Sequence, residues 1–353
     1  MRRSFVRRCG FVLAALALPV LFIGTAASAA PKTNKLASAT LNGDGSTFQL
    51  GFNQVVIGAF KPVQKAVTIN YQGNGSGTGR TDFVNGVVDF AGTDAQYKAT
   101  DPQPKGAYFY FPTVVAPITV SYNVSGVKGL RLTADTIAKI FQGQITTWND
   151  AAIKTDNPKA KLPSTKITVV HRSDSSGTTA NFTKFLNVAA TPTWTLGTGS
   201  TVNWPAGTQG ATGNSGVAKL VKSTDGAVGY VDFSDANASD LTFASVKNSS
   251  GKFIPPNLVS AAAAASGATV NANLTYDPIN AAGAGAYPIT SPTWILVYQN
   301  QTDANKGAAI KAFLNYIYAD GQKLAKSVDY APLPKPLLKA ALTQVRKIVV
   351  PTS

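Results

Sequence analysis

The feature that most constrains this chain is a local pattern that occurs three times: a turn of small residues followed by a segment with helical character. The turns begin at Gly43, Gly73 and Ser173, in the segments GDGSTFQLGFNQVV, GNGSGTGRTDFVNG and SDSSGTTANFTKFL. Such a turn leaves backbone N–H groups unpaired at the positive end of the helix dipole, where an anion is favoured. A single turn of this kind more often serves only to cap a helix. Further residues are therefore needed to show whether the three turns form an anion site.

The turns do not match the common nucleotide-binding motifs. No Gly-Lys pair follows such a loop, as the Walker motif requires. GNGSGTG ends in Thr78 and Gly79, off the dinucleotide spacing, and it opens no clear βαβ unit with an acid placed for a ribose. One histidine and 17 acidic residues without a ligand-spaced cluster indicate no metal site. We therefore expect neither a cofactor nor a metal.

The rest of the chain alternates between short runs rich in β-branched residues and segments with helical periodicity, which favours an α/β fold. These stretches are AVTINYQG (66–73), TDFVNGVVDF (81–90), VVAPITVSYNV (114–124), LTADTIAKIFQG (132–143), KITVVHRS (166–173) and TANFTKFLNVAA (179–190). Thr133 is a predicted helix N-cap. Residues 187–211, 261–274 and 280–288 are expected to be rich in loops.

The N-terminus has the pattern of a secretory signal peptide. Four arginines precede an apolar run, and the run ends in Ala27-Ser28-Ala29 before Pro31, so we expect cleavage after Ala29 and a signal peptide over residues 1–29. The apolar core, Gly10 to Gly24, is short for a membrane span. The chain's only cysteine, Cys9, lies in this leader. The roughly 320 residues that remain are enough for two domains held by core burial without disulfides.

The charge of the chain fits an anionic ligand. The formal net charge is +15, and removing the four leader arginines lowers it to +11. A basic surface suits an anionic ligand or partner, although lysines scattered on solvated faces are the commoner explanation. No run of basic residues is interleaved with aromatic residues, so nucleic acid is not an expected partner.

The segment HRSDSSGTT places the chain's only histidine, His171, near Asp174 and Ser176, so a serine hydrolase has to be considered. Adjacent side chains of a strand point to opposite faces, so His171 and Arg172 cannot both face one site. Ser176 has no G-x-S-x-G elbow around it, and no second histidine is available.

The same segment suits an anion better. Arg172 offers a planar fork of donors that fits two oxygens of a tetrahedral anion, and Asp174 can hold that fork in place. Ser176, Gly177 and Thr178 then supply hydroxyls and amides at a helix start. An ordinary surface Arg–Asp pair before a helix remains the alternative for this segment taken alone.

Across nearly its whole length the sequence resembles the periplasmic phosphate-binding proteins of phosphate ABC transporters, the PstS family. The matching motifs are GDGSTF, YQGNGSG, VDFAGTDA, FPTVV, FQGQITTWND, HRSDSSGTT, GTGSTVNWP, GAVGYVDF, YPITSPTWIL and VDYAPLP. The resemblance implies a two-lobed, type II Venus-flytrap α/β fold, in which each lobe is a central β-sheet flanked by helices. Lobe I would comprise residues 30–112 and 288–353, and lobe II residues 113–287, with crossings near FPTVVAPIT and AYPITSPT.

The resemblance also implies which residues bind phosphate, by motif. They are Thr47, Phe48 (through its backbone amide), Ser76, Asp94, Arg172, Ser176, Gly177 and Thr178, with Asp174 steadying Arg172. Asp94 would accept a hydrogen bond from the proton that phosphate keeps near neutral pH, because an ionised carboxylate has only acceptors. Sulfate has no such proton, so it would leave lone pairs facing each other and be rejected.

The sequence departs from the family pattern at Asp44, where relatives usually carry a small residue, at Gln49, where many have proline, and at Arg80. We expect Asp44 to point to solvent and Arg80 to lie on a helix surface, although either could instead act near the cleft. The resemblance implies a monomeric periplasmic binding protein that delivers phosphate to membrane permease subunits and is not an enzyme. A secreted serine esterase or phosphatase using Ser176 with His171, and an extracellular adhesion or scaffold protein, stay open as alternatives.

Overall fold

A computed structural model describes residues 35–352 of the chain. The predicted signal peptide and Cys9 lie outside the described residues. The strands are β1 (Ala39–Gly45), β2 (Val67–Gln72), β3 (Phe90–Thr93), β4 (Tyr108–Asn123), β5 (Arg131–Leu132), β6 (Thr168–Arg172), β7 (Gln209–Ala211), β8 (Ala227–Asp232), β9 (Thr242–Phe243), β10 (Ser245–Lys247), β11 (Phe253–Ile254) and β12 (Thr290–Tyr298).

The helices alternate with the strands along much of the chain, as the sequence pattern predicts. They are α1 (Leu50–Phe60), α2 (Ser76–Asn85), α3 (Ala134–Phe141), α4 (Ala151–Asp156), α5 (Gly177–Ala189), α6 (Gly213–Ser223), α7 (Phe233–Ala238), α8 (Leu258–Ser266), α9 (Ala304–Tyr316), the π-helical turn η1 (Ile317–Gly321), α10 (Gln322–Leu324), the 3-10 turn η2 (Ala325–Val328) and α11 (Lys335–Val345). Among the described helices, none is both long enough and apolar enough to cross a membrane.

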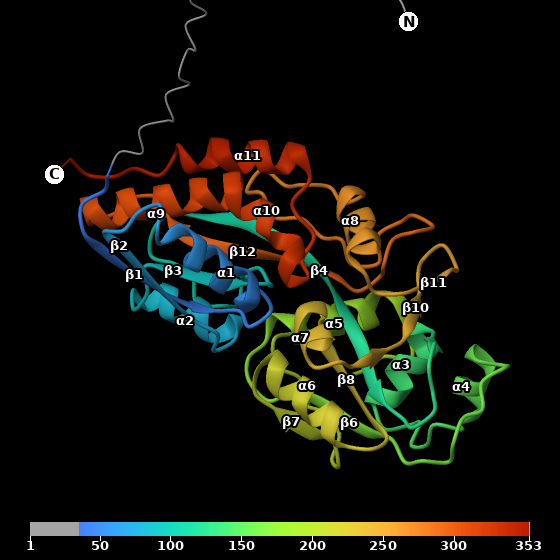
Figure 1. Cartoon of the computed structure of the whole chain (residues 1–353). Coiled ribbons are helices and arrows are strands. Elements are labelled where there is room, and N and C mark those ends of the chain that lie inside the picture. The colour runs from blue at the N-terminus through green and yellow to red at the C-terminus, as the bar shows by residue number, and fades with distance from the viewer. Residues whose placement is uncertain (1–34, 353) are drawn as a thin grey trace, which may run out of the picture. The chain divides into compact units, whose positions relative to one another are not determined.

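Within residues 35–352 the main sheet has nine strands, in the order β2-β1-β3-β12-β4-β8-β6-β7, with β9 paired to β4 beside this path. We call β1, β2, β3 and β12 the first half of the sheet, and β6, β7 and β8 the second half. Strands β1, β2 and β3 are parallel to one another, as are β6, β7 and β8. Figure 1 shows β4 as one long strand that runs from the first half to the second.

Strand β4 joins the two halves and is buried on both faces. Its residues from Tyr110 to Tyr122 are buried without interruption, which is typical of a strand at the centre of a sheet rather than at its edge. Pro117 pairs with β12, whereas the next residue, Ile118, pairs with β8. The chain therefore passes from one half of the sheet to the other within a single strand.

Helices cover both halves. α2 and α9 contact β1 and α1 contacts β2 in the first half, while α5 and α6 contact β8 in the second. The predicted N-cap is confirmed, because Thr133 Oγ1 accepts the N–H of Thr136 at 3.3 Å where α3 begins. Residues 190–208 contain no helix or strand, as expected for this stretch of the described chain.

The prediction that residues 261–274 are loop-rich surface is wrong in its first part. Helix α8 extends to Ser266 and buries Ala261, Ala264 and Ala265. It begins with a capping box between Asn257 and Ser260. Alanine has the highest helix propensity of all residues, so a capped alanine run forms a helix when one side is buried.

Candidate functional site

The three turns of small residues lie together at the carboxyl ends of β1, β2 and β6. The Gly75 N–H donates to the Gly45 carbonyl at 2.8 Å, which joins the first two turns. The Gly77 N–H donates to the Ser175 carbonyl at 2.9 Å, which joins the second turn to the third and so connects the two halves. Ligands of open α/β sheets bind outside the carboxyl ends of the strands, so these turns mark the candidate site.

Asp94 follows β3 and has a buried carboxylate on which hydroxyl groups converge. Among the described residues, Ser46 donates to Oδ1 and Oδ2 at 2.6 and 2.7 Å, Thr293 to Oδ1 at 2.6 Å and Ser76 to Oδ2 at 3.2 Å. Burial raises the pKa of Asp94, and the three hydroxyls and the charge of Arg172 oppose that rise. The site therefore contains a buried acceptor held by donors.

Thr47 and Thr178 come from opposite halves and share one hydrogen-bond partner. Asn214 Nδ2 donates to Oγ1 of each threonine at 3.1 Å, and Asn214 is fully buried at the start of α6. A hydroxyl group has one proton and two lone pairs. Because each threonine accepts from Asn214, its own proton is left for another acceptor.

Arg172, which is buried, and Asp174, which is partly buried, form a bidentate pair. The Arg172 Nε–H donates to Asp174 Oδ1 at 2.7 Å, and a terminal guanidinium nitrogen contacts Oδ2. The Gly213 N–H also donates to Oδ1, at 3.1 Å. Burial alone would raise the pKa of Asp174, but the hydrogen bonds and charge of Arg172 lower it below its usual value. The two side chains are in contact, and the paired hydrogen bonds fix the plane of the guanidinium.

Replacing Asp174 with asparagine is expected to lower the free energy of unfolding by about 1–3 kcal/mol at pH 7, because a hydrogen bond between charged groups is lost. The folded-state pKa of Asp174 lies below its ordinary value of 3.8. Its stabilisation is therefore present above about pH 4 and is lost as pH falls through the folded-state pKa. Urea unfolding measured between pH 7 and pH 3 should show that the free energy of unfolding lost in Asp174→Asn becomes smaller as the pH falls.

Asp277→Asn is the matched control for this measurement. Asp277 pairs with Lys184 at 2.6 Å, but both side chains are more than 40% exposed. Exposed pairs contribute about 0–1 kcal/mol, so this variant should unfold almost as the unmodified protein does. An Asp174→Asn deficit that stays constant from pH 7 to pH 3 would contradict the assigned ionic role.

The remaining predicted residues lie at the same place. Ser176 Oγ accepts the Thr179 N–H at 3.1 Å and so caps α5, and the Phe48 N–H donates to Ser46 Oγ at 3.0 Å. Gly177 is so close to the first half that a Cβ on it would lie 2.4 Å from Ser76 Oγ. All of the residues predicted to bind phosphate are thus buried where the three turns meet.

Sequence reasoning missed four residues of this network: Ser46, Asn181, Asn214 and Thr293. Asn181 donates to the Asp94 carbonyl at 2.7 Å and to the Ser291 hydroxyl at 3.0 Å. Ser46 and Thr293 lie inside motifs that had been singled out, GDGSTF and YPITSPTWIL, so their polar side chains were a usable signal. Asn214 lay in no such motif.

Two expectations about the departures from the family pattern are wrong. Asp44 does not point to solvent: it is buried, and its carboxylate accepts the side-chain amide of Asn74 at 2.8 Å, which braces the first turn against the second. Arg80 is not a free surface residue either. Its guanidinium donates to Thr93 Oγ1 at 3.1 Å in the first half and to Ser200 Oγ at 3.2 Å across from it.

His171 is not placed to act as a base for Ser176. Its Nδ1 lies 3.0 Å from the Arg172 carbonyl, and its ring stacks on Trp204 with centroids 5.0 Å apart. The hydroxyl of Ser176 accepts a hydrogen bond from the backbone of α5 instead. The structure therefore does not assemble the catalytic triad that the hydrolase alternative requires.

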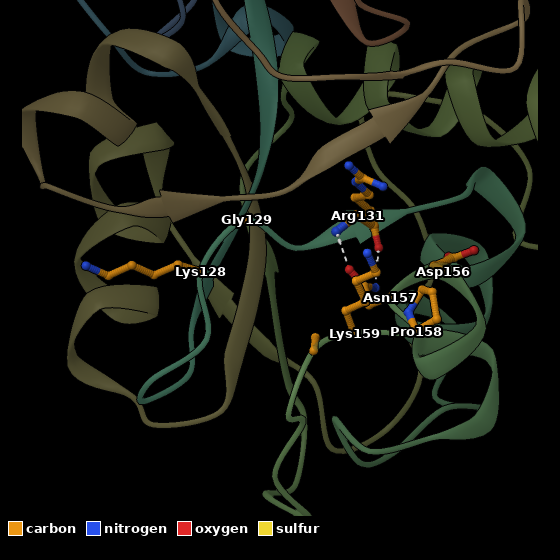
Figure 2. A pocket seen from close by; sticks show the side chains of 8 residues that line it. Lys128, Gly129, Arg131, Asp156, Asn157, Pro158 and Lys159 are labelled. Carbon is orange, nitrogen blue, oxygen red and sulfur yellow. Dashed lines mark hydrogen bonds between the residues drawn. The ribbon is translucent and has the colours of Figure 1, made fainter.

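Two cavities lie outside the meeting point of the three turns, one next to it and one away from it. A cavity of about 470 Å³ lies beside it and is lined in part by Asp94, Asn181 and Trp294. The other, about 410 Å³, is surrounded by Lys128, Arg131 and Lys159 (Figure 2). In it the Asn157 side chain is bonded to the backbone of Arg131 at 2.8 and 2.7 Å, so this amide braces β5 rather than facing a ligand.

Comparison with known proteins was made by sequence and by structure. Residues 28–321 match the model of the PBP superfamily domain. The chain is 37% identical to the phosphate-binding protein PstS of Xylella fastidiosa over 276 residues, covering 77% of this chain and 75% of the relative. It is 36% identical to the phosphate-binding protein PstS 3 of Mycobacterium leprae over 307 residues, covering 84% and 83%.

Solved structures share the fold. The structure of the periplasmic phosphate-binding protein PfluDING bound with phosphate matches with a TM-score of 0.72 at 23% identity, covering 86% of this chain and 93% of that one. An ABC-type phosphate transport receptor from Vibrio cholerae matches with a TM-score of 0.58 at 20% identity, covering 83% and 100%. These identities support the α/β periplasmic-binding-protein fold and nothing finer.

Proposed function

Because this chain belongs to the PBP superfamily and, within it, to the family of PstS phosphate-binding proteins, we propose that it binds inorganic phosphate and delivers it to an ABC-type phosphate importer. It acts as a binding protein, not as an enzyme. The observation that carries the proposal is the meeting of three glycine-rich turns around a buried Asp94 and a buried Arg172. The first supplies an acceptor and the second a fork of donors.

Donors for the phosphate oxygens come from both halves. Arg172 has five N–H donors, of which Asp174 takes two, so three remain for the ligand. Thr47 and Thr178 have protons to donate because Asn214 occupies one lone pair of each. The first turn of α5 adds backbone N–H groups at Gly177 and Thr178. The hydroxyl and amide donors are neutral, so the anion is surrounded by hydrogen bonds without a full set of compensating positive charges.

Asp94 supplies the selectivity. Phosphate near neutral pH carries at least one proton, which a carboxylate oxygen accepts. Sulfate in its place would set its lone pairs against those of Asp94 in a buried site, an unsatisfied contact that costs about 1–3 kcal/mol or more. A site built to bond a ligand's proton rejects an analogue without it by about 10⁴-fold. Arsenate keeps its proton, so this test does not exclude it.

The two halves of the sheet correspond to the two lobes in this proposal. Lobe I comprises residues 30–112 and 288–353, and lobe II comprises residues 113–287. Contacts such as Asn214 to Thr47 would form as the lobes close, and phosphate stabilises the closed form through contacts absent from the open one. The protein is exported by a cleaved signal peptide, acts in the cell envelope as a monomer, and is recognised by the permease subunits when closed.

Titration calorimetry on the protein without residues 1–29, stripped of bound anion, tests the function. Phosphate should bind tightly, and sulfate at least about 10³-fold more weakly. Chromogenic phosphomonoesters should not be turned over. Equal affinity for the two anions, or no binding of phosphate, would contradict the proposal.

Gly177→Ala is expected to weaken phosphate binding by about 5- to 150-fold, because overpacking costs about 1–3 kcal/mol. The added Cβ would lie 2.6 Å from Asp94 Oδ2. Gly58→Ala is the control: it lies in α1 with no atom within 4 Å of its Cβ position, so it should bind phosphate normally. Titration calorimetry measures the phosphate affinity of both variants. Normal affinity in Gly177→Ala would contradict the close contact between Gly177 and Asp94 in the phosphate-bound form.

A further inference from the structure

Gln49, one of the departures from the family pattern, has its side chain inside the site network. It is fully buried just before α1, where it makes no side-chain cap. Its Nε2 donates to Thr293 Oγ1 at 2.7 Å and to the Trp294 carbonyl at 2.9 Å. A carbonyl oxygen only accepts, so the atom that faces Trp294 must be the nitrogen. This fixes the orientation of the amide.

The orientation of the Gln49 amide determines to which acceptor the Thr293 hydroxyl donates its proton. Thr293 Oγ1 accepts from Gln49, and its single proton must go elsewhere. Two acceptors are within reach, Asp94 Oδ1 at 2.6 Å and the Thr93 carbonyl at 3.3 Å. The carboxylate is nearer, and hydrogen bonds to charged acceptors are roughly twice as strong as neutral ones. Gln49, Thr293 and Asp94 therefore form a chain of hydrogen bonds with one direction.

The direction of this chain matters for the acceptor capacity of Asp94. An ionised carboxylate has about four acceptor positions. The protons of Ser46, Thr293 and Ser76 take three of them in the described structure, and Ser76 reaches Oδ2 at the longest distance, 3.2 Å. One position remains for a proton brought by a ligand. Were Asp94 itself protonated, it would be a donor at the place where the ligand has to donate.

We propose that Gln49 is a specificity-determining positioning residue: it commits the Thr293 hydroxyl as a donor to Asp94 and so keeps Asp94 an acceptor for the proton of the bound oxyanion. This inference rests on the proposed function of the site. Burial works against ionisation of Asp94, and the bond from Thr293 works for it. A proline at position 49 could not supply this bond, since it has no side-chain donor.

Other ionisable groups near Asp94 do not replace this effect. The charge of Arg172 favours the ionised form of Asp94, and none of the variants below changes Arg172. Burial raises the pKa of Tyr71 and Tyr330 well above their usual value, so both stay neutral. Asp232, whose backbone N–H donates to Asn214 Oδ1 at 3.4 Å, has a pKa that burial and Asp235 raise. Each variant is therefore compared with the unmodified protein at the same pH.

The test uses Gln49→Leu and Thr293→Val, which remove the two links separately. Phosphate and sulfate affinities are measured by calorimetry from pH 5 to pH 8. In both variants Asp94 loses a hydrogen bond that favours its ionised form, so a smaller share of it stays ionised in acid. The phosphate-to-sulfate affinity ratio at pH 5 should therefore fall by about tenfold relative to the unmodified protein. At pH 8 the ratio should change by no more than about threefold, which is about half of the pH 5 effect in free energy.

Two further variants separate this role from a general structural one. Thr293→Ser keeps the hydroxyl and should restore the ratio. The double variant Gln49→Leu/Thr293→Val should be no worse than either single one, because Gln49 acts through Thr293. Gln344→Leu is the matched control. Gln344 is a buried glutamine that donates to the Tyr110 carbonyl at 2.7 Å and not to Thr293 or Asp94, so its loss should leave the ratio unchanged.

The outcomes distinguish this inference from the proposed function. A ratio that is unchanged at pH 5 in Gln49→Leu, or a loss that is equal at pH 5 and pH 8, would overturn the positioning role while phosphate binding by the unmodified protein stands. If Gln49→Leu does not fold, the contrast between Thr293→Val and Thr293→Ser decides alone. Failure of the unmodified protein to bind phosphate would overturn the proposed function instead.

Discussion

Replacing Arg172 with alanine is expected to weaken phosphate binding by at least about 30-fold, because truncating the buried member of a hydrogen-bonded charge pair costs about 2–5 kcal/mol. Arg172 is the cation of the candidate site, and its side chain is only 1% exposed. Its loss removes three ligand donors and leaves the carboxylates of Asp94 and Asp174 facing the anion without compensation. Calorimetry with phosphate at pH 7.5 measures the change.

Arg131→Ala is the matched control for charge. Arg131 is an exposed residue of β5 that lines the cavity drawn in Figure 2. Its guanidinium lies 5.6 Å from the centre of the Phe253 ring. The Arg131→Ala variant removes the same formal charge without changing the three turns. Phosphate affinity should therefore change by no more than about twofold at physiological salt, where distant charges are screened. Arg172→Lys should be intermediate, since an ammonium group cannot form the fork. Phosphate affinity in Arg172→Ala within tenfold of normal would contradict the assignment.

The parts of the site that the sequence predicts are those set by local chemistry. A turn of small residues before a helix exposes N–H groups whatever the rest of the fold does, and all three such turns proved to lie together. The alternation of strand and helix patterns likewise predicts the α/β fold, which the relatives confirm. The N-cap at Thr133 was also predicted, because an N-cap depends only on the residues at the start of its own helix.

The parts that the sequence did not predict depend on contacts between distant segments. Asn214 lies 167 residues from Thr47, and nothing in either segment shows that they meet. Asp44 and Arg80 were expected at the surface. Asp44 is instead buried against Asn74 of the second turn, and Arg80 bonds Ser200, which lies 120 residues further along the chain. Helix α8 was missed because a run of alanine has no hydrophobic period.

Replacing Asp94 with asparagine is expected to lower the phosphate-to-sulfate affinity ratio by at least about 100-fold, approaching the 10⁴-fold that a ligand's bonded proton is worth. Thr293 donates at the Oδ1 side, so the asparagine oxygen should sit there and the amide nitrogen on the Oδ2 side. That nitrogen would donate to an oxyanion oxygen that carries no proton. Sulfate should gain affinity and phosphate should lose it, as measured by calorimetry at pH 7.5.

The stability of this variant provides an independent check. Burial raises the folded-state pKa of Asp94, so the stabilisation linked to its protonation is complete below about pH 4 and is lost as pH rises through the folded-state pKa. Asparagine does not ionise, so the variant does not lose this stability as the pH rises. Asp94→Asn should therefore unfold at an equal or higher urea concentration than the unmodified protein at pH 8. Asp89→Asn, whose partner is the half-exposed Lys306, should keep normal selectivity. A folded Asp94→Asn variant that still rejects sulfate as strongly as before would show that another group recognises the proton, since a donor at this position cannot distinguish the two anions in favour of phosphate.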